Sequence, residues 1–239
     1  LDTTLREAIH AANNHPGPDI IKFNIPGGGV KTIVLKSNLP PVTDSVTLDG
    51  YTQPGASPNT VAEGDDAVLL IEITGSLGNT GVAGLDIRAG NTTIRGFVFN
   101  KFGTIFLAEN GGNVIEGNFL GTDPTGTVVL DGGAIEIFAS SNNLIGGTTP
   151  AARNLISGSF GFIEIHGGEG PAIIPNAAAF YLASGNVVQG NYLGTDKDGT
   201  MALGSQGVSI FGASNNVIGG TIAGARNVIV GRVGLGAAV

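Results

Sequence analysis

The chain has 239 residues, with 41 glycines, no cysteine and a formal net charge of −8. It has 11 Lys and Arg residues in all, too few and too dispersed for a nucleic-acid interface, and the lack of cysteine excludes disulfides and thiolate metal sites. No apolar run approaches about 18 residues, so the sequence predicts no membrane span. Frequent Gly beside Val and Ile is typical of short β-strands separated by tight corners.

Residues 1–19 differ from the rest of the chain and predict a helical cap followed by a turn. Thr4 and Glu7 have the spacing of a capping box, in which each side chain bonds a free backbone amide of the first helical turn. The apolar residues of one helix face are Leu5, Ala8, Ile9 and Ala12. We expect a short helix to about Asn13 that covers the open end of the core.

Short apolar segments then predict the N-terminal coils of a solenoid over residues 20–112. The expected strands lie near residues 20–25, 32–35, 46–48, 69–73, 85–87, 93–99 and 104–107. Gly, Asn or Pro separates these segments, as at the corners between short strands.

The second half of the chain repeats itself. Residues 113–158 align without a gap on residues 186–231, and 25 of the 46 aligned pairs are identical. Short units of Asn, two apolar residues, a variable residue and Gly recur within each copy, a pattern typical of stacked coils. Residues 159–185 predict an irregular insertion between the two homologous repeats. Ile145 and Ile218 occupy matching positions and are expected to point into the core.

The start of the chain, TTLREAIHAANNHPGPDIIKFNIPG (3–27), and the segment VTLDGYTQPG (46–55) resemble bacterial extracellular right-handed β-helix repeat proteins whose N-terminal motif reads Cys-Ser-Leu-Arg-Glu-Ala. The repeated Gly-Asn-Phe/Tyr-Leu-Gly-Thr-Asp units are similar to the same family. Asp2-Thr3-Thr4 stands where that motif has Cys-Ser. We therefore expect an all-β fold, a right-handed parallel β-helix with a short N-terminal capping helix, as a single domain over 1–239. The resemblance implies a secreted or cell-surface location and no particular activity.

A period of two predicts a column of outward-facing residues on one sheet. The residues that lie between two apolar neighbours are Asp86, Phe106, Glu136, Glu164 and Ser209. His166, two residues after Glu164, shares its face. If Glu136 and Glu164 occupy adjacent coils, their carboxyls can approach the ~5–5.5 Å separation that retaining glycosidases use. A Ca²⁺ ion between these carboxylates, or simple solvation of exposed acids, are the alternatives.

Three functions remain open from these residues. A polysaccharide hydrolase or lyase would use Asp86, Glu136, Glu164 and His166 as catalytic residues. A non-catalytic glycan-binding module would use Ser209 and the aromatic residues near the column, which are Phe106, Phe138, Tyr181 and Phe211. A structural or adhesive surface repeat protein would need neither set. Complete polygalacturonase or pectate-lyase residue sets are not recognisable, so catalysis stays open, and analogy with other β-helix proteins favours polysaccharide as the partner.

Two Gly-Thr-Asp-x-x-Gly-Thr loops, residues 121–127 and 194–200, suggest Ca²⁺ as a cofactor. Asp196 and Asp198 have the spacing that opens a calcium loop, whereas the first copy offers only Asp123. A turn in which the Asp side chain bonds its own backbone explains both copies and is favoured.

Recurrent asparagines predict an internal ladder of stacked amides at the corners: Asn143, Asn154, Asn216 and Asn227. Arg153 and Arg226 recur in the same context and are expected to bond a nearby carboxylate or carbonyl. The segment after residue 230 has few charges and no amphipathic pattern. We expect further coils of a longer parent protein, or the same face of a second copy in a homo-oligomer, to cover the C-terminal end.

Overall fold

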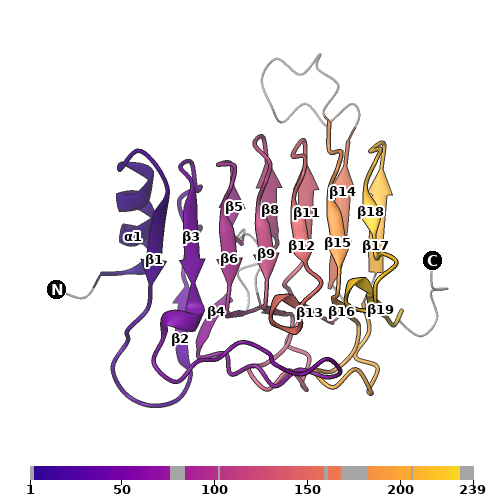
Figure 1. Cartoon of the computed structure of the whole chain (residues 1–239). Helices are drawn as coiled ribbons and strands as arrows, with labels where there is room; N and C mark the ends of the chain where they lie inside the picture. The colour runs from indigo at the N-terminus through magenta and orange to yellow at the C-terminus, as the bar shows by residue number, and fades with distance from the viewer. Residues whose placement is uncertain are drawn as a thin grey trace.

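The computed structural model describes residues 3–75, 84–101, 103–158, 161–167, 182–205 and 207–231. These residues are mostly β, with three all-parallel sheets and one short α-helix among them, an arrangement consistent with a β-solenoid (Figure 1). Within these residues, no helix combines the length and the apolar character needed to cross a membrane.

From β3 onward, successive strands of the chain enter the first, second and third sheets in turn, and one such round is one coil of the solenoid. The first sheet has seven strands: β1 (Asp19–Lys22), β3 (Val46–Asp49), β6 (Thr93–Arg95), β9 (Val114–Glu116), β12 (Leu144–Gly146), β15 (Val187–Gln189) and β18 (Val217–Ile218). The second also has seven: β2 (Lys31–Leu35), β4 (Ile71–Gly75), β7 (Phe97–Asn100), β10 (Phe119–Leu120), β13 (Leu155–Ile156), β16 (Tyr192–Leu193) and β19 (Val228–Ile229). The third has five: β5 (Asp86–Ile87), β8 (Ile105–Ala108), β11 (Ile135–Phe138), β14 (Phe162–His166) and β17 (Gly207–Phe211).

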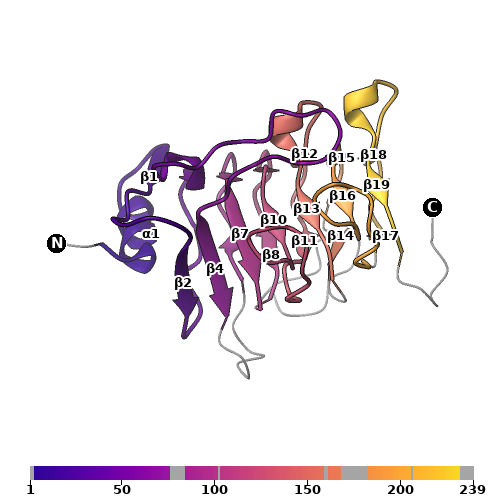
Figure 2. The ribbon, with the colours of Figure 1, turned by 90° about the horizontal axis from the view of Figure 1, so that it is seen from below.

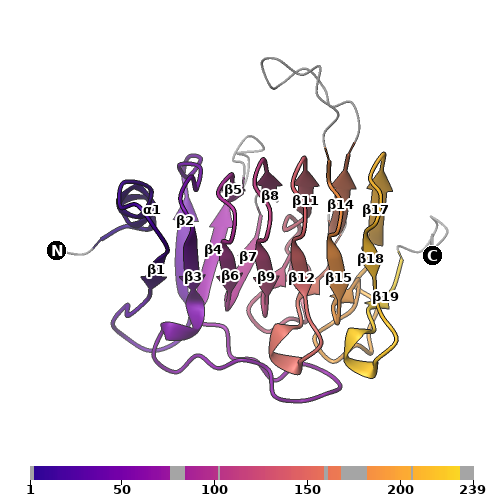
Figure 3. The same ribbon diagram turned by 45° about the horizontal axis from the view of Figure 1, so that its top comes forward.

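The coils stack in chain order, so that neighbouring strands of a sheet belong to successive coils (Figure 3). The homologous repeats therefore cover matching sets of strands, β9 to β13 and β15 to β19. Because β9 and β15 are separated in the first sheet by β12 alone, one sequence repeat is displaced from the other by two coils.

The predicted N-terminal cap is confirmed. Helix α1 spans Leu5–Asn13, the Thr4 side chain accepts a hydrogen bond from the Glu7 amide, and the Glu7 carboxylate accepts one from the Thr4 amide. Leu5, Ile9 and Ala12 are buried in the main core cluster. Helix α1 itself lies at the N-terminal end of the stack, beside β1 (Figure 2). The helix thus satisfies its own first turn and buries its apolar face against the first coil.

The strand expected over residues 93–99 is two strands that belong to different sheets. Gly96 separates β6 from β7 and has a φ of 80°. A Cβ at Gly96 would lie 2.7 Å from the backbone nitrogen of Tyr51 in the preceding coil. Glycine is therefore required both for the corner and for the close approach of the two coils. The apolar pattern runs through the corner, because both strands contribute inward-facing residues.

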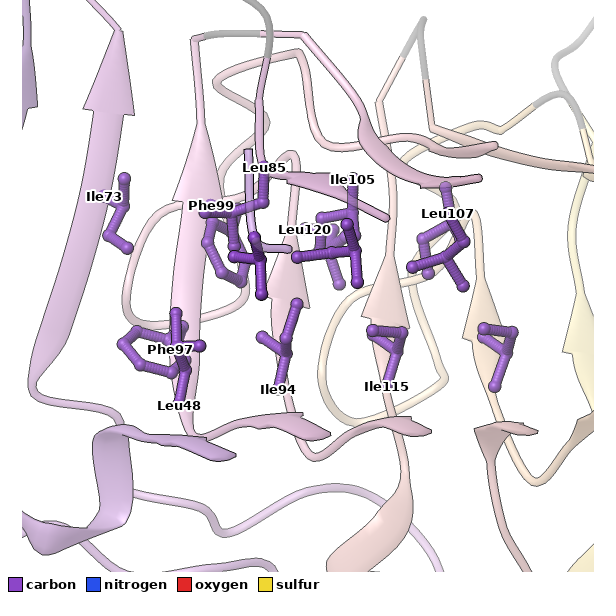
Figure 4. Close-up of a cluster of buried hydrophobic side chains, with 14 of the residues drawn as sticks. Leu48, Ile73, Leu85, Ile94, Phe97, Phe99, Ile105, Leu107, Ile115 and Leu120 are labelled. Atoms are coloured by element: carbon purple, nitrogen blue, oxygen red, sulfur yellow. The ribbon is translucent and has the colours of Figure 1, made fainter. Parts of the chain in front are cut away.

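The core is a continuous stack of aliphatic and aromatic side chains inside the coils (Figure 4). At β5, β8, β11 and β14 of the third sheet the inward residues are at most 1% exposed: Leu85, Ile87, Ile105, Leu107, Ile135, Ile137, Ile163 and Ile165. Because side chains alternate along a strand, the residues between these inward pairs face away from the core.

Two ladders of asparagines, buried except at Asn216 and Asn227, confirm the predicted stacking of corner amides. One contains Asn113, Asn143, Asn186 and Asn216, and the other contains Asn118, Asn154, Asn191 and Asn227. In the first ladder, the Oδ1 of Asn143 accepts from the backbone nitrogen of Asn113 at 3.0 Å and from its Nδ2 at 2.9 Å. Each side chain thus satisfies the backbone of the preceding coil where that chain enters a strand.

Both matching isoleucines have the expected inward register, but only Ile145 is buried. Ile145 on β12 is 0% exposed, whereas Ile218 on β18 is 39% exposed. Both keep the same register, because Ile145 pairs with Val188 and Val188 pairs with Ile218. The difference arises because Ile145 lies between two coils, whereas among the described strands of the first sheet β18 is an edge.

Candidate functional site

The third sheet brings the predicted column together. The parallel register places Asp86 beside Phe106, Phe106 beside Glu136, Glu136 beside Glu164, and Glu164 beside Ser209. Strands β5, β8, β11, β14 and β17 present these residues outward because the residues on either side of them pack inward. Neighbouring members of the column belong to adjacent coils, with strand axes about 4.8 Å apart.

Glu136 and Glu164 occupy adjacent coils, as the sequence predicts for a functional carboxylate pair. Glu136 Oε1 accepts a hydrogen bond from Thr104 Oγ1 at 3.2 Å. Glu164 Oε2 lies 3.0 Å from Nε2 of His166, which is two residues further along β14. Both Glu164 and His166 are partly exposed. The arrangement leaves carboxylate oxygens at the surface that can accept hydrogen bonds from hydroxyl groups. They lie beside an imidazole that can donate or accept a proton.

Ring-bearing side chains at the next outward position, those of Phe138, His166 and Phe211, form a second column beside the carboxylates, and Phe106 of the first column lies near it. The ring centroids of Phe106 and Phe138 are 6.3 Å apart, those of Phe138 and His166 are 6.4 Å apart, and those of His166 and Phe211 are 4.9 Å apart. The last pair is stacked, with an angle of 16° between planes. Phe138 is buried, whereas Phe211 is 50% exposed. We call Glu136, Glu164, Phe106, Phe138, His166 and Phe211 the acid–aromatic face.

Asp86 belongs to the same column but has a different environment. Its Oδ2 lies 3.1 Å from Nη2 of Arg88, and Nη1 of Arg88 lies 3.2 Å from Oε1 of Glu109. Phe106 separates Asp86 from Glu136 in the column. The Asp86 carboxylate is therefore neutralised by a neighbouring cation and is set apart from the Glu136–Glu164 pair.

The other two predicted glycan contacts have different outcomes. Ser209 lies beside Glu164 on β17 and is partly exposed. Tyr181 lies outside the described residues.

The Gly-Thr-Asp loops are turns held by their aspartates, which is the interpretation that the sequence favours. Asp196 Oδ1 accepts from the backbone nitrogens of Thr200 at 2.8 Å and Met201 at 2.9 Å, and Asp123 bonds two amides of its own loop in the same way. Asp198 is engaged separately, 3.0 Å from Nζ of Lys197.

No ligand cluster for Ca²⁺ accompanies these residues. Across the described part of the chain, no group of three or more His, Cys, Asp or Glu side chains could hold a metal ion. This applies to Asp196 and Asp198, and equally to the alternative site between Glu136 and Glu164.

A polar groove, not anticipated from the sequence, lies where β8 and β11 end. It has a volume of about 700 Å³ and is lined by Asn91, Glu109, Asn110, Gly111, Gly112, Ala139, Ser141, Asn142 and Leu182. A second hollow of about 330 Å³ continues it past Asp44 and Ser45 and shares three lining residues, Asn91, Asn110 and Gly111. We call the two together the corner groove. Ala139 in its wall directly follows Phe138 of the acid–aromatic face.

The sequence feature that could have predicted this groove is the residue immediately before the first-ladder position of each coil. Asn91, Asn142 and Asn215 have φ values of 56°, 60° and 58°, and Gly112 and Gly185 occupy the same place in the alternate coils with φ of 77° and 70°. Asn is one of the few non-glycine residues that adopt this backbone region readily. In the pair Asn142-Asn143, the first amide therefore faces solvent at the corner and the second enters the ladder.

Comparison of the chain with protein-family models, with curated proteins and with solved structures found no match.

Proposed function

We propose that this chain is a right-handed parallel β-helix that binds polysaccharide along the outer face of its third sheet. The observation that carries the proposal is the ring column of Phe138, His166 and Phe211, which continues across three coils beside the Glu164 carboxylate. A sugar ring has an apolar C–H face and a rim of hydroxyls. Flat side chains suit the former, and carboxylate oxygens accept hydrogen bonds from the latter.

The repeating geometry supports a polymeric ligand over a small molecule. Equivalent outward positions recur about every 4.8 Å along the solenoid axis, so a linear chain can make similar contacts on successive coils. The corner groove runs beside this face and offers exposed amides at Asn91 and Asn142, two coils apart. An extended glycan lying along the axis would contact both surfaces.

Charge favours a neutral glycan over an acidic one. Among the described residues that line the corner groove, the charged ones are Glu109 and Asp44, both acidic. The acid–aromatic face adds Glu136 and Glu164, and the whole chain has a net charge of −8. A polyuronate would meet repulsion at these carboxylates, whereas hydroxyl-rich neutral chains would meet acceptors.

Handedness and location belong to the same proposal. Crossover connections between parallel strands of one sheet are overwhelmingly right-handed, which supports a right-handed coil. The resemblance of the N-terminal segment to bacterial extracellular repeat proteins supports a secreted or cell-surface setting, where polysaccharide is abundant.

A glycan-binding assay with point variants tests the proposal. The protein is screened against a glycan array, and the dissociation constant for the best neutral oligosaccharide is measured by calorimetry. Phe211→Ala should weaken binding about tenfold, equivalent to about 1.4 kcal/mol, because it removes the exposed end of the ring column. Ile222→Ala, which removes an apolar side chain of similar exposure on a different part of the surface, should leave the dissociation constant unchanged. Binding that is insensitive to Phe211→Ala would contradict the proposal.

Hydrolysis is the second candidate, favoured by the adjacent-coil position of Glu136 and Glu164. Carboxyl groups about 5–5.5 Å apart can serve as nucleophile and general acid in a retaining glycosidase. An assay for new reducing ends and for unsaturated products on neutral polysaccharides distinguishes a hydrolase from a lyase. Glu164→Gln should abolish product formation while leaving the melting temperature nearly unchanged. A wild-type protein that binds glycan and releases no product would be a binding module, and one that does neither would support a structural or adhesive role.

A further inference from the structure

One segment departs from the nearest-neighbour contacts of the solenoid. After the one-turn helix η1 (Gly50–Thr52) the chain runs along one edge of the coils before it returns to β4 (Figure 1). We call residues 59–66 of this segment the strap. The strap leaves from the coil of β3 and β4, yet it contacts the coils of β12 and β15 further along the stack. Repeats of a solenoid otherwise contact only the repeats next to them.

Four side chains fasten the strap to these distant coils. Asn59 donates from Nδ2 to the Pro150 carbonyl at 3.1 Å, and the Tyr192 hydroxyl accepts from the Gly64 amide at 3.0 Å. Arg153 donates to three strap carbonyls, those of Val61, Ala62 and Gly64. Lys197 Nζ donates to the Asp65 carbonyl at 3.2 Å, and the Arg153 guanidinium lies 4.4 Å from the centre of the Tyr192 ring.

The strap carries a buried carboxyl group at this contact. Asp65 is 3% exposed; its Oδ1 accepts from the Ala67 amide at 2.9 Å, and its Oδ2 is buried with no hydrogen-bond partner. An ionised Oδ2 in that position would have lost its hydrating water without gaining a hydrogen-bond donor. A protonated carboxyl is neutral, so its burial costs less free energy.

The groups that act on Asp65 come from each element packed against it. Burial, with a smaller contribution from the adjacent Asp66, raises the pKa of Asp65 to about 6, although the Ala67 amide, Arg153 and Lys197 act to lower it. Tyr51 of η1 also senses the Asp65 charge, which helps to raise the pKa of that phenol. Since the two cations do not cancel the effect of burial, ionisation of Asp65 works against the closed strap.

We propose that the strap is a proton-controlled clasp, closed across the distant coils while Asp65 is protonated and loosened when Asp65 ionises. An acid with a raised pKa in the closed state stabilises that state fully below its ordinary pKa, and this stabilisation is lost as pH rises through the higher value. The equilibrium constant for strap closure is therefore largest below about pH 4 and falls about 100-fold by about pH 7.

Opening the clasp would change the surface that the protein presents. Ala62 and Glu63 of the strap form part of the wall of a cavity of about 450 Å³, which is also lined by Arg153, Tyr192 and Arg226. When the strap leaves, the Arg153 guanidinium loses its three carbonyl partners and this cavity opens along one side. Asp65 thereby couples proton concentration to the exposure of a cationic, aromatic surface.

Amide hydrogen exchange measured across a pH series tests the clasp. Protection of peptides covering residues 59–66 is corrected for the intrinsic exchange rate at each pH. The corrected protection should fall at least tenfold from about pH 4 to about pH 7, whereas peptides covering the ladder at residues 113–120 should keep theirs. Asp65→Asn should make strap protection independent of pH. Asp66→Asn is the matched control, in which the pH response should persist and move to lower pH because the Asp66 charge no longer raises the pKa of Asp65. Asp66 itself is exposed, and hydrogen bonds from Thr60 lower its pKa, which places its own titration below this range.

Two outcomes would overturn the proposal. Strap protection in the wild-type protein that stays constant over this pH range would show that the clasp does not respond to protons. A pH dependence that persists in Asp65→Asn would assign the response to another group. Tyr192→Phe provides a second variant in which the strap loses the acceptor for Gly64 while Asp65 stays in place. Its protection should be lower than wild type at every pH and should still fall as pH rises.

Discussion

At the scale of single residues, the buried asparagines hold the coils in register. Asn143 is 1% exposed and links its own coil to the two coils beside it: its Oδ1 accepts from Asn113 and its Nδ2 donates to Oδ1 of Asn186. An apolar replacement would leave the Asn113 amide without a partner in a dry corner. The same residue type at Asn216, in the second repeat, is only half-buried.

The two positions give a matched pair of variants. Asn143→Ala should lower the free energy of unfolding by about 1–3 kcal/mol, because buried donors lose their acceptor. Asn216→Ala should cost less, since water can reach the groups that it leaves. Chemical denaturation of the two variants measures the difference, and equal losses would mean that burial does not set the strength of the ladder.

At the scale of elements, strands with the same sequence pattern differ in what covers them. β12 and β18 occupy matching places in the two repeats, but β12 lies between two strands of the first sheet and β18 is its last described strand. The exposure of Ile145 and Ile218, 0% and 39%, follows from this position and not from the side chains.

Truncation of these two isoleucines should therefore have unequal effects. Ile145→Ala should destabilise the protein by about 2–5 kcal/mol through lost burial and a residual cavity. Ile218→Ala should cost less than about 1 kcal/mol, because the side chain is already in contact with solvent. Thermal or urea unfolding checks both. A large loss at Ile218 would show that another surface buries it in solution.

At the scale of the whole molecule, the last described coil exposes the continuation of the core. Its inward residues are exposed by 41%, 39% and 42% in the three sheets: Ile210, Ile218 and Ile229. The residues that pair with them one coil earlier are 0% exposed: Ile165, Val188 and Leu193. An apolar sheet end of this kind recruits other chains.

The sequence predicts that further coils of a longer parent protein, or the same face of a second copy, cover this end, and the second alternative can be tested on this chain. If a second copy covers this end, light scattering over a concentration series should show dimers, and Ile229→Asp should shift the protein to monomers by placing a charge in the contact. Ile20→Asp, which changes an exposed residue of β1 in the first coil, should leave the dimer intact if the same face of two copies meets. Equal weakening by both variants would indicate head-to-tail stacking, and a monomer at every concentration would refute the expectation.

Much of the fold and of the candidate site could be predicted from the sequence, because both depend on local spacing. The capping box at Thr4 and Glu7 specifies the helix, and alternation around Glu136 and Glu164 specifies which side chains leave the core. Adjacent coils then bring those side chains together, since each repeat of the strand pattern adds one coil. The corner at Gly96 was missed because an apolar pattern has the same appearance on both sides of a turn.

What only the tertiary structure decided is which residues far apart in the chain meet. Arg153 and Arg226 are equivalent in the repeats, yet the strap reaches Arg153, while Arg226 is exposed. Asp65 resembles any loop acid in the sequence, and its burial depends on a contact that joins Gly64 to Tyr192 across most of the coils. Periodicity reports the local backbone and the inward face of each strand. It carries no information on the path of a long connection, which is set by the packing of the finished stack.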